Sequence, residues 1–92
     1  MIKSFKDEET ENLFERRRNG WSREVKNVGR RKLLMIDAAI TLADLRIPPG
    51  NRLEKLKGDR KGQYSIRIND QWRVCFNWRS GAAYSVEITD YH

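Results

Sequence analysis

Residues 64–92 decide the fold, and they read YSIRINDQWRVCFNWRSGAAYSVEITDYH. Aromatic and β-branched residues alternate with polar ones, which is the period of strands with one buried face. The alternating stretches are residues 64–68, 72–78 and 84–88. Turn-forming residues separate them at 69–71 and 80–82. This part of the chain therefore predicts three consecutive antiparallel strands joined by tight turns.

The parity of the apolar positions sets the strand register. Apolar residues are even-numbered in both of the first two strands. Opposite residues in an antiparallel pair point to the same face, so a three-residue loop at 69–71 lets both strands share one core. That register puts Arg67 directly across from Arg73 on the other face.

The same parity extends to the third strand. With residues 80–82 at the loop tip, the predicted cross-strand pairs are Trp78 with Tyr84, Phe76 with Val86, and Val74 with Ile88. Tyr91 then falls diagonally near Arg73, whereas the facing of Asp90 and His92 is left open by this argument. Cys75 shares the arginine side and is expected to be a packing residue rather than a nucleophile.

Arg67 and Arg73 need compensation if the sheet holds them opposite each other, because facing like charges destabilise a strand pair. An acidic partner or a phosphate would supply it. The alternative is that both side chains extend into solvent, where salt screens their repulsion. The pair therefore predicts an anion-binding surface, with solvated arginines as the competing interpretation.

The rest of the chain predicts helices followed by one more strand. Acids begin and arginines end the first helical segment, and proline and glycine stop the second. A short strand is also expected at residues 1–6 if a later segment pairs with it. The predicted helices are residues 7–18 and 22–45, and the remaining strand is residues 53–57. The order β-α-α-β-β-β-β indicates one α+β domain over residues 1–92, with two helices on one face of a mostly antiparallel sheet of about four to five strands.

Charge and composition limit the classes of function. The 92 residues include 19 Lys and Arg against 13 Asp and Glu, a formal net charge of +6. Residues 1–15 carry a net charge of −3, so the cations are concentrated in residues 16–92, which carry +9. This distribution fits a polyanionic partner, most simply nucleic acid, and fits equally a domain whose charge has no specific role.

The single cysteine and the single histidine limit the compartment and the kinds of metal site that we expect. Cys75 cannot form an internal disulfide, which fits a reducing cytoplasm, and one Cys with one His argues against a structural zinc site. No stretch approaches the roughly 20 apolar residues that span a bilayer. Residues 1–11 become acidic where a signal peptide needs an apolar run. We therefore expect a cytoplasmic protein without a membrane partner.

The residues that could carry chemistry gather on the closing strands and the basic turn before them. They are Lys57, Arg60, Lys61, Arg67, Arg73, Asp90, Tyr91 and His92. RNA cleavage by attack of a 2′-hydroxyl on the adjacent phosphate needs cations for the developing charge and groups that accept and donate a proton. Arginine suits the phosphate because its planar fork makes bidentate contacts. This chemistry requires no metal and no cofactor, although each of these residues taken alone is also consistent with a solvated surface.

Several roles stay open on this argument. His92 or Asp90 can move the proton, and Tyr91 can stack on a base or donate a proton. DNA binding would use the same cations, but the sequence has no helix-turn-helix or zinc-finger spacing.

Four segments together resemble the HigB-type toxins of the RelE/ParE superfamily. They are MIKSF at 1–5, LKGDRKG at 56–62, YSIRINDQWRVCFNW at 64–78 and ITDYH at 88–92. The resemblance implies a RelE-like bacterial toxin of a type II toxin–antitoxin pair. Such a toxin is a metal-independent endoribonuclease, an mRNA interferase that cleaves mRNA in the A site of the 70S ribosome and inhibits translation. The implied antagonist is a helix-turn-helix antitoxin, whose complex with the toxin binds its own operator DNA.

The resemblance also assigns residues. The family's functional positions map to Lys57, Arg73, Asp90, Tyr91 and His92, which we expect to be catalytic. We expect Arg67, Arg60 and Lys61 to bind RNA, and further cations to dock on ribosomal RNA, namely Arg16, Arg17, Arg18, Arg30, Arg31 and Lys32. Many relatives have His where this chain has Glu54, so proton transfer is expected to rely on Asp90 and His92, or activity to be weak. The alternative is a non-catalytic relative that binds RNA, the ribosome or gyrase.

Overall fold

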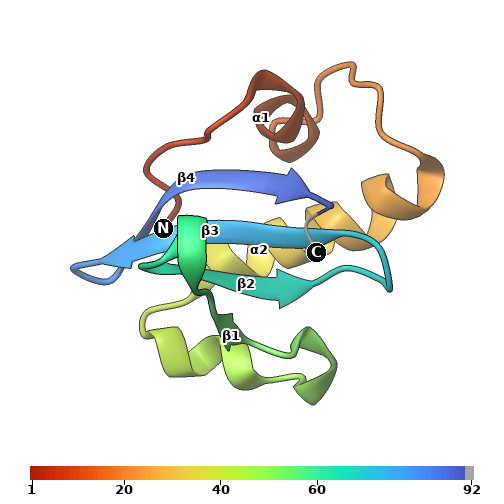
Figure 1. The fold of residues 1–92 in the computed structure, drawn as a ribbon. Helices are drawn as coiled ribbons and strands as arrows, with labels where there is room; N and C mark the ends of the chain where they lie inside the picture. The colour runs from red at the N-terminus through yellow and green to blue at the C-terminus, as the bar shows by residue number, and fades with distance from the viewer. Residues whose placement is uncertain (91–92) are drawn as a thin grey trace.

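The computed structural model describes residues 1–90, which form an α+β fold with one four-stranded sheet (Figure 1). Each strand is antiparallel to its neighbour, in the order β1-β2-β3-β4. α2 lies against one face of the sheet, and α1 lies beside β4 (Figure 1). The elements are α1 (Glu8–Phe14), α2 (Arg30–Ala38), β1 (Glu54–Lys55), β2 (Gln63–Arg67), β3 (Arg73–Arg79) and β4 (Ala82–Thr89). The predicted fold class is confirmed.

The N-terminal segment pairs with β4 without forming a strand of its own. Two isolated parallel bridges join Ile2 to Ala83 and Phe5 to Val86. Four backbone hydrogen bonds of 2.8–3.1 Å connect the two segments around these bridges. The expected strand at residues 1–6 is therefore reduced to two bridges along the outer edge of β4.

The predicted second helix, residues 22–45, is wrong in its extent. A π-helical turn (Val25–Gly29) leads directly into α2, and a separate 3₁₀ helix (Leu42–Arg46) follows it. The break has a physical cause, because the Asp44 carboxylate accepts hydrogen bonds from the backbone N–H groups of Ile40 and Thr41 and caps a new helix. The first helix is also shorter than predicted, since the chain leaves it at Arg16 with φ of 60°.

The π-helical turn approaches the sheet closely at Gly29. A Cβ atom at this position would lie 3.3 Å from Cδ1 of Ile88 and 3.4 Å from Cδ1 of Ile68. Glycine at this point therefore lets the start of α2 pack against the β4 end of the core.

The register of β2 and β3 matches the prediction. Tyr64 lies opposite Phe76, and Arg67 lies opposite Arg73. The Asn69 side chain stabilises the three-residue loop by accepting hydrogen bonds from the backbone N–H groups of Gln71 and Trp72, at 2.9 and 2.7 Å.

The pairing of β3 with β4 differs from the prediction at the hairpin end. The turn is two residues long, Ser80 and Gly81, and both have positive φ. It places Tyr84 opposite Asn77 rather than Trp78, so that predicted pair is wrong. A bulge at Ser85, which also has positive φ, restores the expected register farther along, where Ile88 lies opposite Val74.

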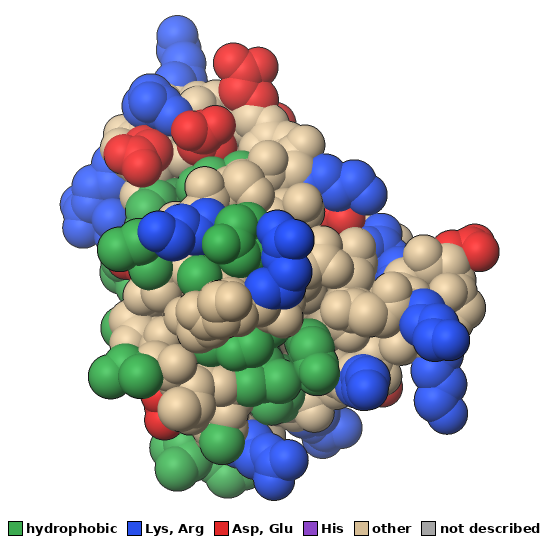
Figure 2. Space-filling model, turned by 90° about the vertical axis from the view of Figure 1, so that its left-hand side faces the viewer, with side chains coloured by type: hydrophobic (Ala, Val, Ile, Leu, Met, Phe, Trp, Pro, Cys, Tyr) green, Lys and Arg blue, Asp and Glu red, His purple; other side chains and the backbone are tan. Residues whose placement is uncertain are grey.

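The core lies between α2 and the sheet. Leu33 and Ile36 from α2 pack with Ile66, Val74, Phe76 and Val86, all fully buried. Larger hydrophobic side chains remain exposed at Met1, Leu34, Ile40 and Ile47. One side of the molecule shows hydrophobic side chains gathered between Lys and Arg side chains (Figure 2). No helix within residues 1–90 is long and apolar enough to cross a membrane.

Candidate functional site

The sheet face opposite α2 carries two rows of polar side chains that cross the strands. One row is Glu54, Ser65, Cys75 and Glu87, contributed in turn by β1, β2, β3 and β4. The next row is Arg67, Arg73 and Thr89. We call this surface the arginine face. Opposite residues of an antiparallel sheet share a face, which is why residues far apart in sequence meet here.

Arg73 lies in a fixed orientation across the arginine face. Its Nε donates a 2.9 Å hydrogen bond to Oγ of Ser65, and its Nη2 donates a 2.8 Å bond to the carbonyl oxygen of Arg52. The Glu54 carboxylate lies 4.0 Å from the same Nη2. With only 19% of its side chain exposed, Arg73 has a guanidinium whose position is fixed by these contacts.

The positive charge of Arg67 is compensated by an acid of the protein itself. Arg67 forms an ion pair with Asp70, three residues later in the loop that joins β2 to β3. Arg73 is balanced by Glu54 on the other side. Each of the two facing arginines thus has its own acidic neighbour, and these acids offset the repulsion between the two positive charges. Both arginine side chains nevertheless remain partly exposed.

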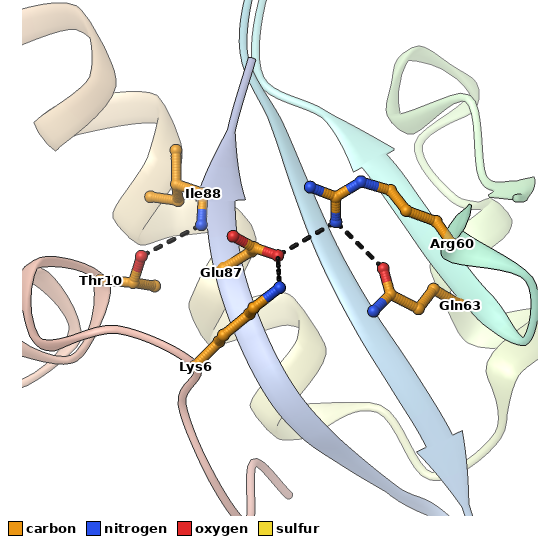
Figure 3. A network of polar contacts seen from close by, with 6 residues as sticks. All are labelled: Lys6, Thr10, Arg60, Gln63, Glu87 and Ile88. Carbon is orange, nitrogen blue, oxygen red and sulfur yellow. Dashed lines mark hydrogen bonds and ion pairs between the residues drawn. The ribbon is translucent and has the colours of Figure 1, made fainter. Parts of the chain in front are cut away.

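A network around Glu87 crosses the same face from the opposite edge. Nη1 of Arg60 lies 3.0 Å from Oε2 of Glu87 and 3.1 Å from Oε1 of Gln63 (Figure 3). Nζ of Lys6 lies 3.3 Å from the same Glu87 oxygen. We call Lys6, Arg60, Gln63 and Glu87 the Glu87 network. Arg60, expected from the sequence to bind RNA, is held over the sheet by these contacts.

Cys75 lies fully buried beneath this charged surface. Burial raises the pKa of the Cys75 thiol to about 11, against a smaller lowering by the positive charge of Arg60. The thiol is therefore neutral near pH 7, and a neutral thiol is a poor nucleophile. This agrees with the prediction that Cys75 packs rather than reacts.

Asp90 follows directly on Thr89, the β4 residue opposite Arg73. Its Oδ2 accepts a 3.1 Å hydrogen bond from Nε2 of Gln71, in the loop between β2 and β3. The structure thus brings Asp90 to the Arg67 and Arg73 end of the face. Tyr91 and His92, the other two predicted residues of the tail, lie outside the described residues.

Lys57 and Lys61 stand on the exposed turn between β1 and β2. Both line a shallow pocket with Lys55, Leu56 and Gly58. No hydrogen bond or ion pair joins either lysine to Arg73 within residues 1–90. The turn therefore offers two exposed cations beside the arginine face, while its third cation, Arg60, reaches toward Glu87.

The sequence reasoning missed several residues of this surface. The sequence pointed to Glu54 only as the residue that stands where many relatives have His, yet its carboxylate lies beside Arg73. Ser65 and Glu87 were not singled out, although the predicted register already put Ser65 and Glu87 beside Cys75. Nothing in the sequence indicated the carbonyl of Arg52, which depends on the left-handed backbone of that residue, with φ of 46°.

A second group of cations lies between the end of α1 and the start of α2. We call it the basic cluster, and it comprises Arg16, Arg17, Arg18, Lys26, Arg30 and Arg31. These residues line an open pocket with Asn19, Asn27, Leu13 and Leu34. Lys32, predicted to join them, is instead buried and donates a hydrogen bond to Asn51. Burial, and then the nearby charges of Arg31 and Arg67, lower the pKa of Lys32.

Comparison with known proteins identifies a family for nearly all of the chain. A family model described as the RelE-like toxin of the type II toxin–antitoxin system HigB matches residues 3–92. The chain is 45% identical over 85 residues to Toxin HigB-1 of Vibrio cholerae serotype O1, with 90% of each chain covered. It is 37% identical over 98 residues to Endoribonuclease HigB of Proteus vulgaris, with both chains fully covered.

Solved structures share the fold at lower sequence identity. A YoeB–YefM complex from Staphylococcus aureus matches with a TM-score of 0.62 and 19% identity, covering 100% of this chain and 98% of that one. A YafQ mutant from E. coli matches with a TM-score of 0.52 and 14% identity, covering 98% and 93%. At these identities the likeness concerns the fold.

Proposed function

This chain belongs to the RelE-like HigB toxin family of type II toxin–antitoxin systems, and we propose that it is an endoribonuclease that cuts mRNA in the A site of the 70S ribosome. The name of the Proteus vulgaris relative, Endoribonuclease HigB, supports the reaction class. The observation that carries the proposal is the geometry of Arg73, a guanidinium held against the sheet by Ser65 and the Arg52 carbonyl.

Arg73 is the group that we assign to the scissile phosphate. Attack of the 2′-hydroxyl places an additional negative charge on the phosphorane, and a cation positioned in advance stabilises that charge without reorganising. Lys57 and Arg67 hold the RNA backbone, and Arg60 and Lys61 add positive charge along its path. Arginine and lysine supply all the charge stabilisation in this scheme, and no metal ion or cofactor takes part.

Proton transfer falls to the end of β4. Asp90 or His92 moves the proton, and Tyr91 orients or stacks the base. The Glu54 carboxylate lies on the opposite side of Arg73, at 4.0 Å, where it keeps the guanidinium oriented. We assign the roles of base and acid to the tail and leave Glu54 as a support for the cation.

A neutralising antitoxin is part of the proposal. One of the structural relatives is described as a YoeB–YefM toxin–antitoxin complex, which supports a protein antagonist for this chain as well. We assign that role to a helix-turn-helix protein, whose complex with the toxin binds its own operator DNA. The site of action is the bacterial cytoplasm, where translating ribosomes are found.

Primer extension on an mRNA translated in the presence of the purified protein tests the proposal. We expect discrete cleavage within codons on ribosomes and little cleavage of the same RNA when it is free. Rapid cutting of naked RNA would argue for an ordinary ribonuclease. Stalling of ribosomes without any cut would instead indicate a relative that only binds the ribosome.

A further inference from the structure

Glu87 is enclosed in the arginine face although the proposed chemistry gives it no role. Its side chain is 14% exposed, and its Oε2 contacts Nη1 of Arg60 and Nζ of Lys6, at 3.0 and 3.3 Å. Withdrawing a carboxylate from water is costly unless cations and hydrogen bonds surround it. Two cations from distant parts of the sequence converge on this single oxygen (Figure 3).

We propose that Glu87 is a positioning residue for RNA cleavage, one that fixes the Arg60 guanidinium and the turn that carries Lys57 and Lys61 over the arginine face. This inference rests on the proposed ribonuclease function. It assigns Glu87 an action through Arg60, without contact to the reacting phosphate.

The topology explains why the turn needs such an anchor. The turn follows β1, the edge strand of the sheet, which is only two residues long. Its own backbone hydrogen bonds are local, from Arg60 to Lys57 and from Lys61 to Gly58. The Arg60 side chain connects this edge to β4 at the opposite edge, with a second bond to Gln63 of β2. Arg60 therefore ties the turn, which lies over the sheet, to β4 at the far edge (Figure 3).

The residues beneath Arg60 make this crossing possible. Ser65 and Cys75 precede Glu87 in the same row, and both are small and fully buried. Arg73 extends from the same region toward Arg52 and Glu54, while Arg60 extends toward Glu87. The two guanidinium groups thus lie on the face in opposite directions, and each is directed by its own glutamate.

Substitution of Glu87 by Gln separates positioning from simple charge. The change raises the net charge by one, so nonspecific attraction to RNA increases. If Glu87 acts by positioning, the cleavage rate of ribosome-bound mRNA falls about tenfold although the toxin concentration for half-maximal rate does not rise. Glu11→Gln is the matched control, because it makes the same charge change in the exposed pair of Glu11 with Arg17, away from the arginine face.

A double-substitution cycle tests whether Glu87 acts through Arg60. In an Arg60→Met background, Glu87→Gln is expected to cause no further loss of cleavage rate, since the group that it positions is gone. An equal loss in both backgrounds would overturn the inference.

Hydrogen exchange gives a readout that does not depend on activity. Backbone amides of residues 57–62 are expected to exchange faster in Glu87→Gln than in the original protein or in Glu11→Gln. Unchanged exchange in this turn would overturn the inference even if cleavage changes. Faster exchange in a protein that cuts no mRNA would support Glu87 as the anchor of the turn and refute the proposed function alone.

Discussion

The arginine face and the basic cluster both concentrate positive charge, but they hold it in different ways. On the face, Arg60, Arg67 and Arg73 each contact an acid of the same sheet surface or its loops. In the cluster, Arg17 has an exposed pair with Glu11 at 3.7 Å, and Nε of Arg30 donates to the carbonyl oxygen of Phe14. The face therefore orients its cations, whereas the cluster mainly accumulates them.

The difference separates two uses of positive charge. An oriented guanidinium can stabilise one charge at one position, which is what a reaction needs. A group of exposed cations attracts a phosphate backbone with little regard to sequence or exact position, which is what docking needs. On this basis we propose that RNA cleavage takes place at the arginine face and that the basic cluster contacts ribosomal RNA.

The largest effect is expected from Arg73→Ala. Loss of the oriented guanidinium should lower cleavage of ribosome-bound mRNA by about 100- to 1000-fold. The thermal unfolding midpoint should fall only slightly, because Arg73 contributes two hydrogen bonds at a partly exposed site. Arg79→Ala is the matched control, since Arg79 shares the strand and the side of the sheet but lies over the Tyr84 ring. Full activity of Arg73→Ala at equal expression would remove the face as the reaction site.

The titration of Cys75 shows whether water is excluded from beneath the arginine face, as the burial of this thiol indicates. The unfolded thiol loses its proton above its ordinary pKa of 9.0, while the folded thiol keeps its proton up to about 11. A raised folded pKa stabilises the fold fully below pH 9.0, and that stabilisation disappears as pH rises through 11. The free energy of unfolding should fall by about 2–3 kcal/mol over this range relative to Cys75→Ala, measured by urea denaturation at several pH values. Parallel curves for the two proteins would show that the thiol is accessible to water.

The basic cluster is expected to give a smaller effect with a different signature. Replacement of Arg16, Arg17 and Arg18 by Gln should weaken ribosome binding about tenfold and make its salt dependence shallower by about two to three ions. The cleavage rate of the complex at saturation should stay the same. The control replaces three exposed cations elsewhere, Lys3, Arg46 and Arg79. An equal loss of binding in the control would show that the cluster acts only through its contribution to the total charge of the protein.

The smallest effect is expected from the ion pair of Glu11 with Arg17. Both side chains are about half exposed, so Glu11→Gln should change the free energy of unfolding by less than about 0.5 kcal/mol. Lys6→Met removes a cation from the enclosed Glu87 instead and should destabilise the protein more. Chemical denaturation of both variants under one buffer compares them directly. A larger loss from Glu11→Gln would reverse the contrast between the two regions.

Strand order and register could be predicted well because alternation has a period of two and one face is buried. That pattern alone placed Arg67 opposite Arg73, as the structure confirms. It failed at Tyr84, because a two-residue turn followed by a bulge at Ser85 keeps the distant register while it changes the near one. Parity at one end of a strand therefore does not fix the other end.

Helix length and side-chain partners were harder to predict. Apolar residues from Leu33 to Leu45 are compatible with one long helix, and only the Asp44 side chain, through its bonds to Ile40 and Thr41, divides them. The prediction that Lys32 is available to dock on RNA was also wrong, because Lys32 is buried against Asn51. Asn51 lies 19 residues away in a separate turn. Such contacts depend on how loops fold back, which no local pattern records.

The attachment of the N-terminal segment to β4 has a consequence for folding. Backbone groups of residues 1–6 pair with β4, and Oγ1 of Thr10 accepts a hydrogen bond from the backbone of Ile88, 78 positions later. Contacts this distant close large loops, so they form late and slow the folding of the sheet. The β4 edge, and the carboxylate that Lys6 reaches on it, are therefore completed only after β4 has emerged from synthesis. A nascent chain remains without its arginine face until then.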